Sequence, residues 1–517
     1  MISMPAMIER AARLNPEGMC TRYQGREYSW RETESRVARL GAALASLGLA
    51  DADRVAILSL NSDRYYESVF AIPWAGACVV PLNTRWALAE NKYAVADSGA
   101  RVLLFDDAFT AQAEELLSAI PTLETVIYMG DGQTPAWARS YEQMLEDNDA
   151  IVPSSRGWHD MAGIFYTGGT TGFPKGVMQS HRALWASAIG ALPEFNMSRE
   201  SVYIHAAPMF HMADFAGSMG ATLRCASNVI VQSFDPAGVL RTIGQDRISH
   251  ALLVPSMIKM VLNDPAIADA DVSSLECVLY GASPMPTATL EQFMNQWPRV
   301  GLVQVYGQTE LAPIVTTLSM EDHKEGSDKL RSAGRPTASS EVRIVDEEGN
   351  DCVQGSSGEI VVRGPHTMLG YWNKPEETAA ALRDGWVFTG DAGYLDEEGY
   401  LYIVDRVKDM VVSGGENVYT TEVENAVISH AAVLDVAVIG VPHEEWGEAV
   451  HAIVVLAPGQ SASEEEIVAH CRERIAGYKL PKSITFREEP LPLSGAGKVL
   501  KTELRKPFWE GRDRQVN

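Results

Sequence analysis

Residues 166–177 read Tyr166-Thr-Gly-Gly-Thr-Thr-Gly-Phe-Pro-Lys-Gly-Val177 and follow the apolar run Met161–Phe165. Glycines allow consecutive backbone N–H groups to turn toward one anion, hydroxyl groups add further donors, and the ammonium group of Lys175 adds a positive charge. The donors in this stretch come from Thr167, Gly168, Gly169, Thr170, Thr171 and Gly172. The stretch therefore predicts a loop that follows a strand and binds phosphate groups.

This loop differs from a Walker A loop. Phe173 and Pro174 separate Gly172 from Lys175, and Gly176 stands where a Walker A loop has the Ser or Thr that binds magnesium. The alternative interpretation is a glycine-rich surface turn, but such a turn requires neither three hydroxyl groups nor a lysine. We therefore favour a phosphate-binding loop of another kind.

The composition and length indicate a globular protein of more than one domain. Of its 517 residues, 46% are hydrophobic and 21% are charged, and the length favours two to four domains. The formal net charge of −25 disfavours a nucleic-acid coat, because an acidic chain repels polyphosphate. The six cysteines lie far apart without a CxxC pair, so we expect reduced, packed thiols rather than disulfides or a zinc site.

The ends and apolar stretches of the chain favour a cytoplasmic protein. The N-terminus leads into Glu9 and Arg10 without the basic and apolar regions of a secretory signal. The apolar stretch from Val69 to Leu82 is shorter than the roughly 20 residues that span a bilayer, and it contains two prolines. We therefore expect no membrane span.

Hydrophobic periodicity predicts alternating helices and buried strands. Residues 31–47 and 65–75 have apolar residues at helical spacing, whereas 54–59 and 101–105 are short β-branched or apolar runs. This alternation is typical of an α/β fold with a largely parallel sheet. The runs 341–346, 359–363 and 400–404 are separated by Gly-containing turns and indicate an antiparallel region.

Past Asp405 the pattern restarts as a compact unit. It predicts helices over 421–430 and 463–475 and strands over 433–440 and 449–456. This order of elements indicates a small α+β domain at the end of the chain.

Five motifs in a fixed order give the chain a close resemblance to the adenylate-forming superfamily, which includes acyl- and aryl-CoA synthetases. The resemblance covers about residues 10–506. Its motifs are the loop at 166–177, Tyr306-Gly-Gln-Thr-Glu310, Thr389-Gly-Asp391, Asp405-Arg-Val-Lys-Asp409 with Ser413-Gly-Gly-Glu-Asn417, and Ser494-Gly-Ala-Gly-Lys498.

The resemblance implies the domain organisation. We expect an α/β multidomain fold with a large N-terminal adenylation domain, residues 1–404, built from α/β layers and a β-barrel-like part. A hinge at 405–408 would join it to a small mobile α+β domain, residues 409–517, that carries Lys498.

The resemblance also implies a reaction with ATP and Mg²⁺. A carboxylate would attack the α-phosphorus of ATP, forming an acyl adenylate and releasing pyrophosphate. The loop from Thr167 to Lys175 would hold the β- and γ-phosphates, and Glu310 would hold magnesium with Thr167 as a second contact. Magnesium prefers hard oxygen ligands and keeps waters, so one carboxylate beside the phosphates suffices. Thr309 and Lys498 would hold the α-phosphate and the incoming carboxylate oxygen.

The rest of the nucleotide site is assigned in the same way. Tyr306 would flank the adenine, and Asp391 would accept hydrogen bonds from the ribose hydroxyls. The segment Gly281-Ala282-Ser283 would form a shelf between the nucleotide and the acyl pocket. The remaining nucleotide-site residues are Gln304, Gly307 and Gln308.

The second half-reaction would transfer the acyl group to the thiol of coenzyme A. The family achieves this by rotating the C-terminal domain about the hinge motif, with Arg406 beside the pivot Lys408. The loop Ser413-Gly414-Gly415 would then approach, its glycines leaving room for the pantetheine chain. The candidates for the coenzyme A nucleotide are Trp446, Lys479 and Lys482. Their alternative interpretation is a packed tryptophan and surface lysines.

The acid-binding side is expected to be apolar. His211 matches a family position at the mouth of the acyl pocket, whereas Asp214 is unusual and would suggest a substrate hydroxyl or amine only if it faced the pocket. The remaining candidate lining contains no Arg or Lys, which favours a monocarboxylic acid, fatty or aromatic. This lining comprises Phe215, Gly217, Met257, Tyr280, Val305, Ala312 and Pro313.

The leading hypothesis is therefore an ATP-dependent carboxylate–CoA ligase. A free-standing adenylation enzyme that loads a carrier-protein thiol is the alternative, disfavoured because no carrier module follows Asn517. A nucleotide-binding regulator without chemistry would be preferred only if Lys498 were absent. We expect no nucleic-acid partner, and a homodimer stays open.

Overall fold

The computed structural model describes residues 2–167, 174–283, 285–406, 409–413, 416–443, 446–493 and 499–510. The chain divides into two compact units. The first comprises residues 1–342 and 362–387, and the second comprises residues 343–361 and 388–517. Each unit has its own hydrophobic core.

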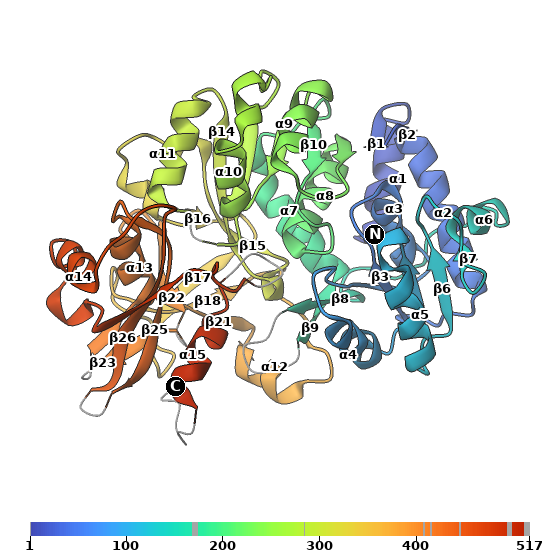
Figure 1. The fold of residues 1–517 in the computed structure, drawn as a ribbon. Helices are drawn as coiled ribbons and strands as arrows, with labels where there is room; N and C mark the ends of the chain where they lie inside the picture. Colours follow the sequence, from blue (N-terminus) through green and yellow to red (C-terminus); the bar gives the residue numbers. More distant parts are fainter. Residues whose placement is uncertain are drawn as a thin grey trace. The chain divides into compact units, whose positions relative to one another are not determined.

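The first unit contains an eight-stranded sheet with the order β19-β9-β8-β4-β3-β5-β6-β7 (Figure 1). The strands from β4 to β7 pair in parallel, and the neighbouring strands β8 and β9 form an antiparallel pair. Their bounds are β3 Arg54–Leu58, β4 Cys78–Pro81, β5 Val102–Phe105, β6 Thr125–Tyr128, β7 Arg139–Ser140, β8 Met161–Thr167, β9 Lys175–Ser180 and β19 Gly370–Tyr371.

The first unit also contains a nine-stranded sheet with the order β16-β15-β14-β13-β12-β10-β11-β1-β2. The five strands from β14 to β11 in this order pair in parallel. The bounds are β1 Met19–Tyr23, β2 Arg26–Ser29, β10 Val202–His205, β11 Ser227–Ile230, β12 His250–Leu252, β13 Cys277–Gly281, β14 Gly301–Gly307, β15 Ile314–Leu318 and β16 Arg335–Pro336.

Helices of the first unit begin at residues suited to capping. The hydroxyl of Ser29 accepts a hydrogen bond from the backbone of Glu32, and Glu32 accepts one from the backbone of Ser29, which fixes the start of α2. Asp235 caps α9 in the same position. The helices are α1 Met4–Leu14, α2 Trp30–Ser46, α3 Asp63–Trp74, α4 Leu88–Ser98, α5 Thr110–Ala119, α6 Tyr141–Glu146, α7 His181–Phe195, α8 Met212–Arg224, α9 Pro236–Gln245, α10 Pro255–Leu262, α11 Thr287–Gln296 and α12 Pro375–Ala381.

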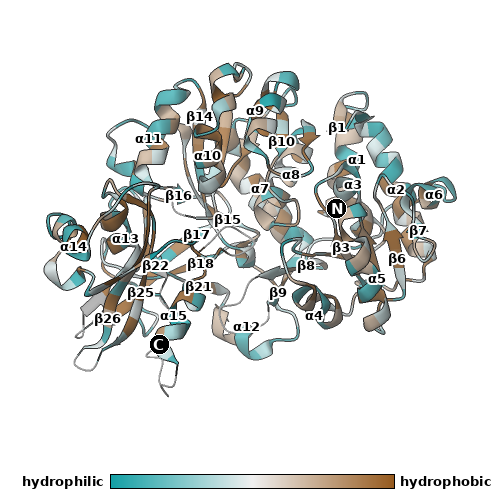
Figure 2. Cartoon of the chain, viewed as in Figure 1, coloured by the Kyte–Doolittle hydropathy of each residue, from teal (hydrophilic) through white to brown (hydrophobic). Residues whose placement is uncertain are grey.

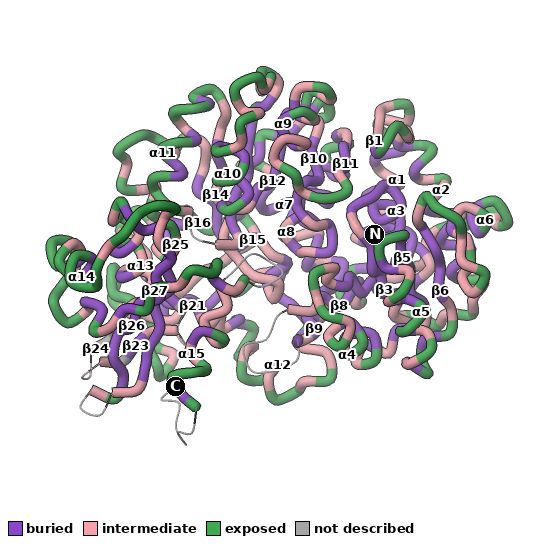
Figure 3. The backbone as a smooth tube through the Cα atoms, viewed as in Figure 1, coloured by how far each residue is buried: buried purple, intermediate pink, exposed green. Residues whose placement is uncertain are grey.

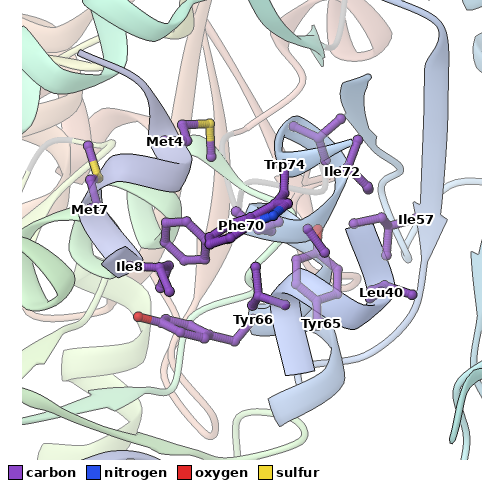
Figure 4. Packing of buried hydrophobic residues seen from close by; sticks show 14 of the residues in the cluster. Met4, Met7, Ile8, Leu40, Ile57, Tyr65, Tyr66, Phe70, Ile72 and Trp74 are labelled. Atoms are coloured by element: carbon purple, nitrogen blue, oxygen red, sulfur yellow. The ribbon is translucent and has the colours of Figure 1, made fainter. Parts of the chain in front are cut away.

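Large apolar side chains fill the space between the N-terminal helices and the first sheet. Figure 4 shows Met4 and Ile8 of α1 beside Tyr66 and Phe70 of α3, and all four are almost fully buried. In Figure 3 the strands β3 and β5 are buried, whereas much of the outer side of α11 is exposed. This burial of apolar area stabilises the sheet that carries β8 and β9.

The second unit contains two antiparallel-rich sheets. In one, β25 and β26 form a long antiparallel hairpin, and Figure 2 shows β26 as strongly hydrophobic. In the other, β21 pairs antiparallel with β22. The strands that lie wholly or mostly in this unit are β17 Glu341–Val345, β18 Gly358–Arg363, β21 Trp386–Leu395, β22 Leu401–Arg406, β23 Val411–Ser413, β24 Glu416–Val418, β25 Val433–His443, β26 Gly447–Leu456 and β27 Ser483–Arg487. The short strand β20 Leu382–Arg383 falls within residues 362–387 of the first unit.

The described part of the second unit also contains the α-helices α13 Thr420–Ile428, α14 Glu464–Arg472 and α15 Lys501–Trp509. The predicted α/β class with largely parallel pairing and the antiparallel region after residue 341 are confirmed. All six cysteines are free thiols. Among the residues that the structure describes, no helix combines the length and apolarity that a membrane span requires. The hinge at 405–408 stays a prediction.

Candidate active site

Several predicted site residues follow the carboxyl ends of neighbouring strands in the nine-stranded sheet. His211 lies in the segment after β10. Gly281 is the last residue of β13, and Ala282 and Ser283 follow it. Tyr306 and Gly307 are the last residues of β14, and the turn to Glu310 follows them. β13 and β14 are parallel, with Gly281 opposite Val305. In open α/β sheets, ligands bind outside the carboxyl ends of the strands, so this edge is the candidate site.

Two glycines at this edge are required by close packing of backbone. A Cβ atom on Gly281 would overlap the backbone oxygen of Val305, and one on Gly307 would overlap that of Pro313. Ala282 follows with a left-handed φ of 67°. The shelf predicted from Gly281-Ala282-Ser283 therefore has a backbone surface in direct contact with β14.

The predicted phosphate loop joins two paired strands. Thr167 at the end of β8 lies opposite Lys175 at the start of β9, and the Thr167 hydroxyl donates to the Lys175 carbonyl at 3.5 Å. Pro174 is buried. The predicted loop residues Gly168, Gly169, Thr170, Thr171 and Gly172 lie outside the described residues.

A buried glutamine connects the two sheets at the candidate site. Gln179, on β9, is fully buried, and its Nε2 donates to the backbone oxygen of Thr309 at 2.5 Å. Because Lys175 is on the same strand, the base of the phosphate loop and the Thr309–Glu310 turn are held together. The sequence motifs contain no signal for this contact.

Tyr371 is a second residue that the motifs do not identify. Its hydroxyl donates to Glu310 Oε1 at 2.8 Å, and the Lys175 ammonium lies 5.2 Å from the centre of its ring. The backbone N–H of Met368 also donates to the Glu310 carbonyl, at 2.9 Å. Burial and then the Glu310 carboxylate raise the pKa of Tyr371 above its usual value, so its hydroxyl stays protonated. The only sequence signal is the Gly370-Tyr-Trp372 triplet, which falls outside the five motifs.

On the acid-binding side, His211 precedes α8 and caps it. Its Nδ1 accepts a hydrogen bond from the backbone of Ala213 at 3.3 Å, and its ring centre lies 6.4 Å from that of Phe210. This fixes the orientation of a partly exposed imidazole at the start of α8.

Asp214 is fully buried and is engaged within the protein. Its Oδ2 lies 2.7 Å from His205 Nδ1, and its Oδ1 accepts from the Tyr203 hydroxyl at 3.3 Å. The amide nitrogen of Asn228 donates to two carbonyls, so its oxygen accepts from His205 Nε2 at 3.0 Å. The Asp214 carboxyl group therefore has its hydrogen-bond partners within the protein, without a substrate.

Tyr280 and Gln304 lie at the same edge of the sheet. His323 Nδ1 lies 2.7 Å from the Ser319 carbonyl, which can only accept, so Nε2 accepts from the Tyr280 hydroxyl at 2.9 Å. Burial lowers the pKa of His323, which keeps its ring neutral. The Tyr280 hydroxyl also lies 3.4 Å from Gln304 Oε1.

Within the second unit, the structure describes some of the predicted residues. Asp391 is buried on β21, where its backbone pairs with that of Arg406 on β22. Ser413 ends β23 and lies opposite Gly447 on β26. The predicted residues Lys408, Gly414, Gly415 and Lys498 lie outside the described residues.

The coenzyme A candidates separate into two groups. Trp446 stacks on His443 with ring centres 4.2 Å apart, and the Lys482 ammonium lies 5.2 Å from the Trp446 ring. Lys479 instead forms an ion pair of 2.6 Å with Glu422. Trp446 and Lys482 therefore form one aromatic–cation surface, whereas the charge of Lys479 is already paired.

The family of AMP-binding enzymes matches residues 8–372, and the C-terminal domain of AMP-binding enzymes matches residues 422–498. The chain belongs to the AMP-binding enzyme family. A feruloyl-CoA synthase of Amycolatopsis sp is 38% identical over 500 residues, covering 96% of this chain and 98% of its own. An indoleacetate–CoA ligase of Aromatoleum aromaticum is 35% identical over 502 residues, covering 96% and 97%.

A solved structure of an acyl-CoA synthetase is also similar to this chain. The o-succinylbenzoate CoA synthetase of Bacillus subtilis, in complex with its acyl-adenylate intermediate, has a TM-score of 0.84 and 29% identity, covering 98% of both chains. The predicted superfamily, the fold class and the reaction class of an AMP-forming acid–thiol ligase are confirmed. The co-substrates of this AMP-binding enzyme are ATP and coenzyme A, with Mg²⁺ as the metal of the ATP reaction.

The residues present at the candidate site fit a magnesium nucleotide. Glu310 offers a partly exposed carboxylate, and within the described part of the chain no group of three or more His, Cys, Asp or Glu side chains could hold a metal. A single carboxylate suits Mg²⁺, which takes one or two carboxylates and completes its shell with phosphate oxygens and water. Among the described residues, the buried Nε2 of Gln308 has no hydrogen-bond partner, so one donor is left unsatisfied beside the Thr309–Glu310 turn.

Proposed function

We propose that this AMP-binding enzyme joins an aromatic or fatty monocarboxylic acid to coenzyme A through an acyl adenylate, releasing AMP and pyrophosphate, with the site residues assigned below. The observation that carries the proposal is the meeting of Lys175, Thr309 and Glu310 through Gln179 and Tyr371. A cation and a carboxylate, next to a turn whose threonine carries a hydroxyl group, suit a metal-bound triphosphate and the charge that develops at its α-phosphorus.

The chain's own residues divide the work of the first half-reaction. Thr167 and Lys175, at the two ends of the loop, bind the β- and γ-phosphates, and Glu310 holds Mg²⁺, which neutralises phosphate charge when bound. Thr309 orients the α-phosphate, and Lys498 contacts the attacking carboxylate oxygen. Tyr306, Gln304, Gln308 and Asp391 bind the nucleoside.

The second half-reaction needs the thiol of coenzyme A to reach the carbonyl that Lys498 contacts. We propose that the domain of residues 409–517 rotates about the hinge at 405–408, which removes Lys498 and brings in Ser413. Trp446 and Lys482 then hold the nucleotide end of coenzyme A, because an aromatic face and a cation suit adenine and phosphate.

Aromatic monocarboxylic acids are the first candidates for the substrate. The feruloyl-CoA synthase and the indoleacetate–CoA ligase are named for aromatic monocarboxylic acids, and the chain aligns with both over nearly its full length. Asp214 has partners inside the protein, so it does not call for an amine or hydroxyl on the acid.

The direct test supplies the purified protein with ATP, Mg²⁺, coenzyme A and one acid at a time, from benzoate- and cinnamate-type acids to short, medium and long fatty acids. We expect AMP and the acyl-CoA thioester to appear in equal amounts, fastest with an aromatic acid. Product that forms only with an added carrier protein would replace the proposal by carrier loading. Release of neither AMP nor thioester with any acid would reject it.

Two further assignments extend the proposal. A cytoplasmic location suits an enzyme with free thiols that uses ATP and coenzyme A. A homodimer is tested by light scattering coupled to gel filtration, where a mass near 56.4 kDa would exclude it.

A further inference from the structure

We propose that Tyr371 is a positioning residue for the metal site: its hydroxyl holds the Glu310 carboxylate in the orientation in which that carboxylate binds Mg²⁺. The inference rests on the proposed role of Glu310. It concerns a residue outside the five motifs, and it follows from contacts on three sides of Tyr371.

The backbone of Tyr371 is fixed from two directions. On one side, β19 pairs with β9, with Tyr371 opposite Val177, and the Trp372 N–H donates to the Gly176 carbonyl at 2.7 Å. On the other side, the Tyr371 N–H donates to the Thr378 hydroxyl at 2.9 Å. The backbone that carries the Tyr371 ring is therefore hydrogen-bonded to β9, the strand that begins at Lys175.

The Tyr371 hydroxyl contacts Glu310, and the backbone of the Thr309–Glu310 turn is also held by hydrogen bonds. Met368 donates to the Glu310 carbonyl and Gln179 donates to that of Thr309, so only the Glu310 side chain is left to be oriented. A free glutamate side chain loses rotamer freedom when it binds a metal. The hydrogen bond from Tyr371 to Oε1 removes part of that freedom in advance and occupies only one of the two carboxylate oxygens.

A hydrogen-bonded second layer behind a metal ligand is worth a measurable amount of affinity. Removing such a partner typically weakens metal binding 10- to 100-fold. The Lys175 ammonium lies 5.2 Å from the centre of the Tyr371 ring, so this ring contacts both the predicted phosphate-binding cation and Glu310.

The test measures metal binding without turnover. In the absence of acid and coenzyme A, equilibrium dialysis with radiolabelled ATP gives the dissociation constant in excess Mg²⁺ and in EDTA. We expect the wild-type protein to bind ATP more tightly with Mg²⁺, and Tyr371→Phe to reduce that Mg²⁺-dependent gain about tenfold. The dissociation constant in EDTA should change less than about twofold.

Tyr141→Phe is the matched control. The Tyr141 hydroxyl donates to the buried Glu67 at 2.7 Å, so this variant also loses a tyrosine–glutamate hydrogen bond in the first unit, away from the candidate site. Its Mg²⁺-dependent gain should equal that of the wild type. If both tyrosine variants lost the gain equally, a general loss of stability would explain it and the inference would be overturned.

A double variant tests whether Tyr371 acts through Glu310. In a Glu310→Asp background the carboxylate is one methylene shorter and out of reach, so adding Tyr371→Phe should change the gain less than about twofold. Additive effects of the two changes would overturn the inference, as would an unchanged gain in Tyr371→Phe alone. Failure of the proposed function is recognised separately, by the absence of acid-dependent AMP release from the wild-type protein.

Discussion

Lys501 and Glu424 form an ion pair of 2.7 Å inside the second unit, between α15 and α13. The Lys501 ammonium also donates to the Thr420 hydroxyl at 2.6 Å, and that hydroxyl donates to Asp405 at 2.7 Å. One connected set of side chains therefore joins the strand that ends just before the predicted pivot to the helix that starts just after the predicted catalytic lysine.

Lys501→Met should destabilise the second unit by about 1.5–3 kcal/mol, because it leaves the partly buried Glu424 carboxylate without its cation. Burial already raises the pKa of Glu424. The measurement is the urea midpoint followed by fluorescence. Lys506→Met, at an exposed position of the same helix, should shift the midpoint little, and adding Glu424→Gln to Lys501→Met should restore part of the loss. Equal midpoints for Lys501→Met and Lys506→Met would show that the Lys501–Glu424 ion pair does not stabilise the second unit.

Gly281→Ala should reduce acid-dependent pyrophosphate exchange by 100-fold or more, because its Cβ would separate β13 from β14 at the shelf. Gly220→Ala is the control, since the nearest atom to its Cβ would lie 3.7 Å away, an ordinary contact inside α8. Alanine also favours a helix over glycine there. Exchange at the wild-type rate in Gly281→Ala would argue against a site at this edge.

Acid should unfold the protein through its buried histidines. Burial lowers the pKa of His181, His366 and His451 to about 4 from 6.5. Between pH 6.5 and 4 the unfolded chain binds more protons than the folded one, so stability falls as the pH falls, by up to about 3 kcal/mol for each such histidine.

His181→Gln isolates one of these contributions, because His181 Nδ1 accepts from the Met4 backbone and cannot be protonated without losing that contact. The urea midpoint measured from pH 8 to pH 4 should fall less steeply in this variant than in the wild type. His159→Gln, at an exposed position, should leave the slope unchanged. Identical slopes for all three proteins would show that His181 does not contribute.

Lys498→Ala should slow pyrophosphate exchange by about 100- to 1,000-fold or more, because it removes a charge from the developing transition state. Retained exchange would refute the assignment of Lys498.

Lys408→Pro should separate the two half-reactions. A fixed φ hinders rotation about the pivot, so pyrophosphate exchange should persist while thioester formation stops. Equal loss of both steps would count against rotation of the C-terminal domain.

Local patterns predicted the regular elements well. The predicted helix over 31–47 corresponds to α2 at Trp30–Ser46, and the predicted strand over 54–59 corresponds to β3 at Arg54–Leu58. Both predictions succeed because the spacing of apolar residues depends only on the element that contains them. The contacts of Gln179 and Tyr371 could not be predicted in this way. Tyr371 reaches a carboxylate 61 residues earlier in the chain, and only the pairing of β19 with β9 creates that proximity.

Asp214 illustrates the same limit. The sequence left open whether Asp214 faces the acid, and the packing of α8 on β10 gives it His205 and Tyr203 as partners. The sequence around a single carboxylate does not show which distant side chains will form hydrogen bonds with it.

The bond from Gln179 to Thr309 has a consequence for how this molecule can change over evolutionary time. The side-chain amide of Gln179 directly joins a strand of one sheet to a turn that follows a strand of the other. Lengthening, shortening or removing that amide would shift the cation and the carboxylate apart, so substitutions at position 179 should be tolerated only together with a compensating change near position 309.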